Sequence, residues 1–182
     1  FETNSNFIVI SVLSIMLVSA SWISLRTTSL PRRILLLNAI NAILIGGFSV
    51  LIIMTQGVLM IDPWYEPSFM IPLAGMIFAN CMNGISLAAE RLESELNQGK
   101  SFSEAKVIAL KTSLIPITNM LLAVGLVSLP GMMTGQILSG VSPMIAVRYQ
   151  IMVMCMFFSS TGISVAVFLQ SVRGQFKNKE IA

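Results

Sequence analysis

The residues that most often carry out chemistry in proteins are scarce in this chain. Its 182 residues include no histidine, which removes the commonest general base and the commonest metal ligand. The two cysteines, Cys81 and Cys155, both lie in apolar runs, which argues against a zinc module or a disulfide framework. The sequence contains no acidic pair and no nucleophile–base constellation that would suggest an active site. We therefore expect this chain not to be an enzyme.

The remaining candidates for chemistry are neutral polar and sulfur-containing residues inside apolar runs. Amide oxygens can line a polar route, and thioethers can bind soft metal ions. The alternative is packing, because amides form hydrogen bonds between membrane helices and methionines fill irregular gaps. The residues that we assign to a possible translocation path are Met76, Asn80, Asn83, Asn119 and Met120. The metal ligands, if there are any, stay unknown at this stage.

Composition indicates the kind of element that positions these residues. Hydrophobic residues make up 55% of the chain and charged residues only 10%, whereas soluble domains carry about a quarter charged residues. So few charges cannot cover the surface of an ordinary soluble domain, and lipid is the expected solvent. In lipid the backbone must satisfy its hydrogen bonds within helices or closed barrels. Because no run alternates as barrel strands do, we expect an all-α bundle of transmembrane helices.

Five largely uncharged stretches are long enough to cross a hydrocarbon core of ~30 Å as helices. They cover about residues 7–25, 34–60, 69–89, 108–129 and 148–170. The second stretch is longer than a span requires and contains Gly46 and Gly47, so tilt or a local break is expected there.

The segment before the last span is uncharged but too short to cross the membrane. It covers residues 132–147 and follows a Pro-Gly break, so a re-entrant or surface-lying segment is expected. The residues that we assign to a possible outer gate are Pro130, Gly131, Met132 and Met133.

The basic residues are sorted by side. With five spans, ten of the 11 Lys and Arg residues fall on one side, and only Arg148 falls on the other. Since the positive side of a membrane protein is cytoplasmic, the N-terminus is expected outside and the C-terminus inside. A chain that enters a span within about six residues, without an initiator methionine, is expected to be N-terminally truncated.

Eight of the 19 charged residues (11 basic plus 8 acidic) lie in residues 90–111, between the third and fourth spans. Gly99 suits a helix C-terminus, and Ser101 with Glu104 has the spacing of a capping box. These signals predict a helix, a glycine turn and a second helix on the cytoplasmic side. Such a shape is suited to docking a cytosolic partner, although a solvated connector is the plainer alternative. The residues that we assign to docking are Glu93, Leu96, Gly99, Ser101 and Glu104.

Three segments resemble a known family of membrane proteins. They are residues 71–77 (Ile-Pro-Leu-Ala-Gly-Met-Ile), 126–135 (Leu-Val-Ser-Leu-Pro-Gly-Met-Met-Thr-Gly) and 149–153 (Tyr-Gln-Ile-Met-Val). The sequence is similar there to the FetB-type iron-export ABC transporter permeases, a family that also includes plant aluminium-tolerance membrane proteins. The resemblance is strongest over residues 69–170.

The resemblance implies a single transmembrane permease domain over residues 1–182, with residues 90–111 as the loop that couples it to an ATPase subunit. The permease would pair with a second copy, export iron-like metal ions and lie in the bacterial cytoplasmic (inner) membrane. ATP and Mg would be bound by the partner subunit, since this chain has no Gly-x-x-x-x-Gly-Lys-Ser/Thr loop and no expected cofactor. Nucleic acid is not an expected partner. The alternative is a secondary carrier that does not use ATP, or a structural membrane subunit.

Overall fold

The computed structural model describes residues 6–29, 32–127 and 129–177, and these residues form helices and connections without a strand. The elements are α1 (Asn6–Ser24), α2 (Arg32–Ile43), η1 (Leu44–Phe48), α3 (Ser49–Ile52), η2 (Ile53–Val58), α4 (Pro67–Asn97), α5 (Phe102–Ala123), α6 (Gly131–Leu138), α7 (Pro143–Ser171) and α8 (Arg173–Lys177). Five helical stretches are long and apolar enough to cross a membrane, and the second of them runs through η1, α3 and η2. The predicted all-α fold with five spans is confirmed.

Several helix ends differ from the ends of the expected spans. The predicted ends at residues 89 and 108 mark where charged side chains begin, but α4 continues to Asn97 and α5 already begins at Phe102. A helix needs only its own backbone hydrogen bonds, so it runs on past the apolar stretch. Residues 90–111 are therefore mostly the ends of two long helices, joined by residues 98–101.

The outer ends of the last two spans are also shifted. The helix α5 ends at Ala123, well before the predicted residue 129, and Gly125 just beyond it has a φ of 81°. A left-handed glycine ends a helix efficiently, which makes the later Pro-Gly pair unnecessary for this purpose. The helix α7 begins earlier than predicted, with Pro143 in its first turn. Ser142 precedes it without a side-chain capping bond.

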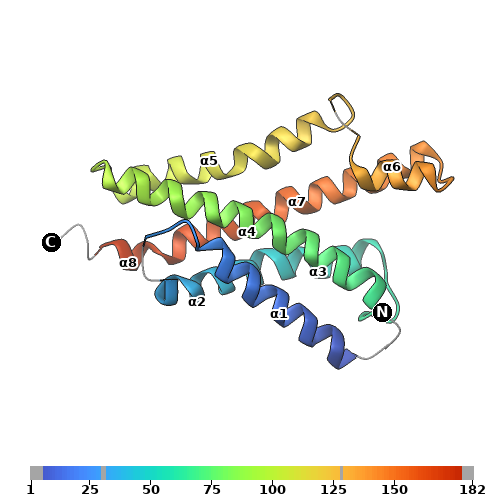
Figure 1. Ribbon diagram of the computed structural model, residues 1–182, viewed down its shortest axis with the longest axis horizontal. Helices are drawn as coiled ribbons and strands as arrows, with labels where there is room; N and C mark the ends of the chain where they lie inside the picture. Colours follow the sequence, from blue (N-terminus) through green and yellow to red (C-terminus); the bar gives the residue numbers. More distant parts are fainter. Residues whose placement is uncertain (1–5, 30–31, 128, 178–182) are drawn as a thin grey trace.

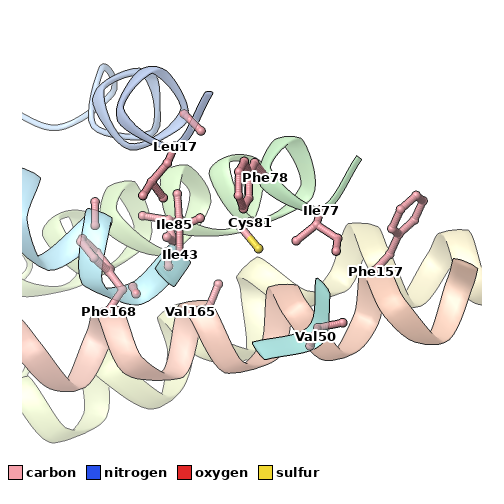
Figure 2. Close-up of a cluster of buried hydrophobic side chains, with 14 of the residues drawn as sticks. Leu17, Ile43, Val50, Ile77, Phe78, Cys81, Ile85, Phe157, Val165 and Phe168 are labelled. Atoms are coloured by element: carbon pink, nitrogen blue, oxygen red, sulfur yellow. The ribbon is translucent and has the colours of Figure 1, made fainter. Parts of the chain in front are cut away.

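The core lies where α4, α7 and the second span cross. Figure 2 shows Ile43, Ile85 and Phe168 near one another in this core, from α2, α4 and α7. The predicted break at Gly46 and Gly47 is present as the π-helical turn η1.

Glycines make the crossings in this core close. A Cβ on Gly46 would lie 2.3 Å from Ser164 Oγ, and one on Gly84 would lie 2.5 Å from Thr161 Cγ2. Between these two crossings, the hydroxyl of Ser164 donates to Cys81 Sγ at 3.3 Å. Small residues thus let the second span and α4 approach the backbone of α7.

The bundle has two distinct ends (Figure 1). The connection between α4 and α5, the connection between α1 and α2, and α8 lie at one end. The helix α6 and the connection between η2 and α4 lie at the opposite end. From their shared connection, α5 diverges from α4 toward that opposite end.

Candidate functional site

The turn between α4 and α5 has the conformation that the sequence predicts. Gly99 has a φ of 84°, and its amide donates to Leu96 O at 3.0 Å. The amide of Glu104 donates to Ser101 Oγ at 3.4 Å, and the amide of Ser101 donates to Glu104 Oε2 at 3.3 Å. The helix, glycine turn and capped helix are confirmed, and we call residues 93–104 the hairpin tip.

The most buried charge of the hairpin tip is one that the sequence did not single out. The side chain of Glu95 is fully buried, 2.5 Å from Arg91 Nη2, and it also accepts a hydrogen bond from Lys100 Nζ. Lys100 comes after Gly99, so this ion pair spans the turn. The Lys100 hydrogen bond, together with the positive charge of Arg91, lowers the pKa of the Glu95 carboxyl from its ordinary value and outweighs the opposing effect of burial. Arg91 precedes Glu95 by four residues, a common spacing of helical ion pairs, but this spacing indicates neither the burial of Glu95 nor its second cation.

Glu93, assigned to docking from the sequence, faces the interior of the chain. Its carboxylate accepts hydrogen bonds from Thr28 Oγ1 at 2.8 Å and from the Ser29 amide at 3.1 Å, as well as from the Ser29 hydroxyl. Thr28 and Ser29 belong to the connection between α1 and α2, which we call the α1–α2 linker (residues 25–29 of those described). Glu93 therefore joins the hairpin tip to the first two helices and is only half exposed.

Two further polar contacts fix the hairpin at this end of the bundle. Thr27 Oγ1 lies 3.2 Å from Ser86 Oγ, two turns before Glu93 on α4. Lys106 donates to Gln170 Oε1, which joins α5 to the end of α7. These partners are about 60 residues apart in sequence, and no local pattern identifies them.

The assigned residues of the hairpin tip are thus divided between inside and outside. Leu96 packs partly against the hydrophobic core, whereas Gly99, Ser101 and Glu104 are exposed. A polar cleft of about 550 Å³ lies beside the tip, between the α1–α2 linker and α4. Its lining includes Ser29, Glu93 and Asn97. The exposed turn offers a contact surface, while the buried residues hold its shape.

The residues assigned to a translocation path are not enclosed within one copy of the chain. Asn80 is half buried, but its Nδ2 donates to Met76 O at 2.8 Å within α4. Asn83, Asn119 and Met120 are exposed. Asn80 precedes Gly99 by 19 positions, and Asn119 follows it by 20. On the antiparallel helices α4 and α5, both residues therefore lie at a similar distance from the turn, about 30 Å along the helix axis. The helix α5 diverges from α4 away from their shared turn (Figure 1), and the exposed Asn83, Asn119 and Met120 are not covered by other parts of one copy.

The residues assigned to an outer gate start the short helix α6. Pro130 is its N-cap, and Gly131 is its first residue. Met133 is buried against the bundle, whereas Met132 is 40% exposed. With eight residues, α6 is too short to cross a membrane and packs alongside α7. The expectation of a short surface-lying or re-entrant segment agrees with this helix, although its role as a gate stays a prediction.

The part of the chain that the structure describes contains no cluster of three or more His, Cys, Asp or Glu residues that could hold a metal ion. The amides and methionines assigned to the path offer oxygen and sulfur donors that are neutral. Such neutral donors suit weak, transient contact better than a resident metal.

Comparisons with known proteins place the chain among membrane proteins. A UPF0014 membrane protein of Synechocystis is 36% identical over 200 residues, which cover 98% of this chain and 75% of that protein. The probable iron export permease protein FetB of Escherichia coli is 33% identical over 129 residues, or 63% of this chain and 50% of that protein. The protein ALUMINUM SENSITIVE 3 of Arabidopsis thaliana is 32% identical, and the match covers 55% of this chain and 42% of that protein.

No solved structure matches the chain. The relatives confirm the resemblance that residues 71–77, 126–135 and 149–153 suggest, and with the five apolar helices they identify an integral membrane protein of permease type. Because the family model matches residues 1–176, nearly the whole chain, the protein belongs to the uncharacterised protein family UPF0014.

Proposed function

We propose that this chain is the transmembrane permease subunit of an ABC-type transporter that exports metal ions, with iron as the first candidate. ATP and Mg are bound by a separate ATPase subunit, and two permease copies work together in the bacterial cytoplasmic membrane. The printed name of the Escherichia coli relative supports export of iron by a permease. The positive-inside rule supports the placement of the hairpin tip in the cytoplasm.

The observation that carries the proposal is the construction of the hairpin tip. Its turn is exposed, but it is fixed by the capping box of Ser101 and by the buried Glu95. A surface that receives mechanical force from a partner must be accessible and must not deform locally. A solvated connector needs neither property.

The contacts of the hairpin tip also supply a route for movement. A force on the tip reaches α1 and α2 through Glu93, and it reaches α7 through Lys106 and Gln170. ATP-driven closure of the ATPase subunits would thus move several spans together. In a pair of permease copies, Asn119 and Met120 would line a route between the copies, because one copy leaves them exposed.

The experiment compares two glycines with the same backbone conformation at opposite ends of the bundle. Gly99 and Gly125 have φ values of 84° and 81°, and a Cβ added to either would meet no described atom within 4 Å. Each is replaced by valine in the full-length protein, which is copurified with its candidate ABC ATPase. Gly99→Val should reduce the copurified ATPase at least tenfold, whereas Gly125→Val should leave it unchanged. Equal recovery with both variants would contradict the proposal.

Transport tests separate this function from that of a secondary carrier or a structural subunit. Cells that lack the gene should accumulate iron, measured alongside other metals, and the protein should restore export only when ATP is present. Export that continues after ATP depletion with an ion gradient intact would favour a secondary carrier. No change in the content of any metal would favour a structural subunit.

A further inference from the structure

The α1–α2 linker is flanked by three exposed arginines. Arg26, Arg32 and Arg33 form no ion pair with an acidic residue in the described ranges. The first turn of α2 contains no acidic residue. The carboxylate of Glu93, which contacts the linker, accepts hydrogen bonds from Thr28 and Ser29. Three positive charges thus lie within eight residues of the chain, and no described carboxylate forms an ion pair with them.

One of these arginines is held in place on an aromatic ring. The guanidinium carbon of Arg32 lies 5.8 Å from the ring centroid of Trp22, and Arg32 Nη2 donates to Arg26 O at 3.4 Å. Stacking of a guanidinium on tryptophan restricts its motion and leaves the edge of the guanidinium able to donate hydrogen bonds. Arg32 is therefore preorganised before any ligand binds.

The three arginines lie at the ends of the first two spans, which is the level of the membrane interface. The first spanning helix ends at Ser24 and the second begins at Arg32, so the linker lies where two spans leave the hydrocarbon core. Trp22, one turn before Arg26 on α1, is 46% exposed. Tryptophan at this depth is typical of the membrane interface, where lipid headgroups lie.

We propose that Arg26, Arg32 and Arg33, with Trp22 beneath them, form a binding site for the headgroup of an anionic phospholipid. The phosphate accepts hydrogen bonds from the guanidinium groups, because an arginine fork matches two phosphate oxygens. The acyl chains lie against the exposed face of α1 beside Trp22. Bound lipid offsets part of the positive charge on and beside the α1–α2 linker. This site does not depend on the transport function proposed above.

The test titrates the purified full-length protein in detergent with phosphatidylglycerol or phosphatidylcholine and counts bound lipids by native mass spectrometry. The wild type should bind phosphatidylglycerol at least tenfold more tightly than phosphatidylcholine. A variant with Arg26, Arg32 and Arg33 all replaced by glutamine should lose this preference. The control replaces Arg148, Lys111 and Arg173 by glutamine, which gives the same net charge, and it should keep the preference.

Further arms make each outcome decisive. If the triple variant does not fold, Arg33→Gln alone replaces it in the test. Arg33 is exposed, so this substitution leaves the packing of the described residues intact. It should weaken phosphatidylglycerol binding about threefold. Loss of the preference in the control variant, or its survival in the triple variant, overturns the site. Full displacement of the lipid by 10 mM inorganic phosphate overturns its assignment to a lipid. If the triple variant keeps its lipid preference but recovers less of the ATPase subunit, the arginines contact that protein and not a lipid.

Discussion

Replacing Glu93 by alanine removes the one side chain of α4 that accepts hydrogen bonds from both Thr28 and Ser29. A hydrogen bond to a charged group contributes roughly 1.5–3 kcal/mol when buried, and less when solvent screens it. Because Glu93 is half exposed and its lost partners regain water, we expect a total loss of about 1–3 kcal/mol. The loss should be local, since it frees the α1–α2 linker without disturbing the core.

Hydrogen–deuterium exchange of the protein in detergent measures this local effect. The amide of Ser29 donates to Glu93 Oε2, so its exchange should accelerate about fivefold to 150-fold in Glu93→Ala, as 1–3 kcal/mol implies. Glu93→Gln keeps one acceptor oxygen and should give an intermediate rate. Glu90→Gln is the matched control, because Glu90 lines the same cleft one turn away and is exposed. Equal rates at Ser29 in the Glu90 and Glu93 variants would refute the reasoning.

Three other variants test the packing and electrostatics of the bundle. Gly84→Val should destabilise the fold by about 1–3 kcal/mol, because its Cβ would meet Thr161. Gly162→Val is the control and should not destabilise the fold, because the space around Gly162 is open. Thermal unfolding distinguishes the two variants. Ser101→Ala should cost about 1 kcal/mol through loss of the cap of α5, measured as faster exchange of the Glu104 amide. The lowered pKa of Glu95 means that its carboxylate stabilises the fold above its ordinary pKa of 4.5. The difference in unfolding free energy between the wild type and Glu95→Gln should therefore shrink as the pH falls through the folded-state pKa. A difference that grows on acidification would contradict this.

The features that the sequence predicts well are those determined by neighbours along the chain. The five spans follow from runs of apolar residues, which lipid requires whatever the tertiary structure. The turn at Gly99 and the cap at Ser101 depend on residues within one turn of helix. The departure from regular helix near Gly46 was expected for the same reason, since two adjacent glycines weaken a helix locally.

The features that the sequence does not predict are contacts between distant segments. Nothing near Glu93 indicates that Thr28 and Ser29 are its partners, because that contact depends on how α1 and α4 pack. The charged residues after Ala89 marked the end of the predicted span, and a helix was expected among them, but not that α4 would run from the span through these residues as one helix. Charge indicates where lipid ends but does not indicate where a helix ends.

The chemistry of Glu93 and Glu95 shows how one short segment can combine two requirements. A surface that docks a partner is usually charged and mobile, but these two carboxylates are used for internal contacts, one across the turn and one to the α1–α2 linker. The exposed residues at the turn can therefore vary with the partner while the two carboxylates keep the position of the turn. The same contact joins the hairpin tip to the α1–α2 linker, which contains Arg26 and precedes Arg32 and Arg33. Lipid binding there and movement of the tip would then act on the same segment, so an anionic lipid should change how far a push on the tip moves α1 and α2.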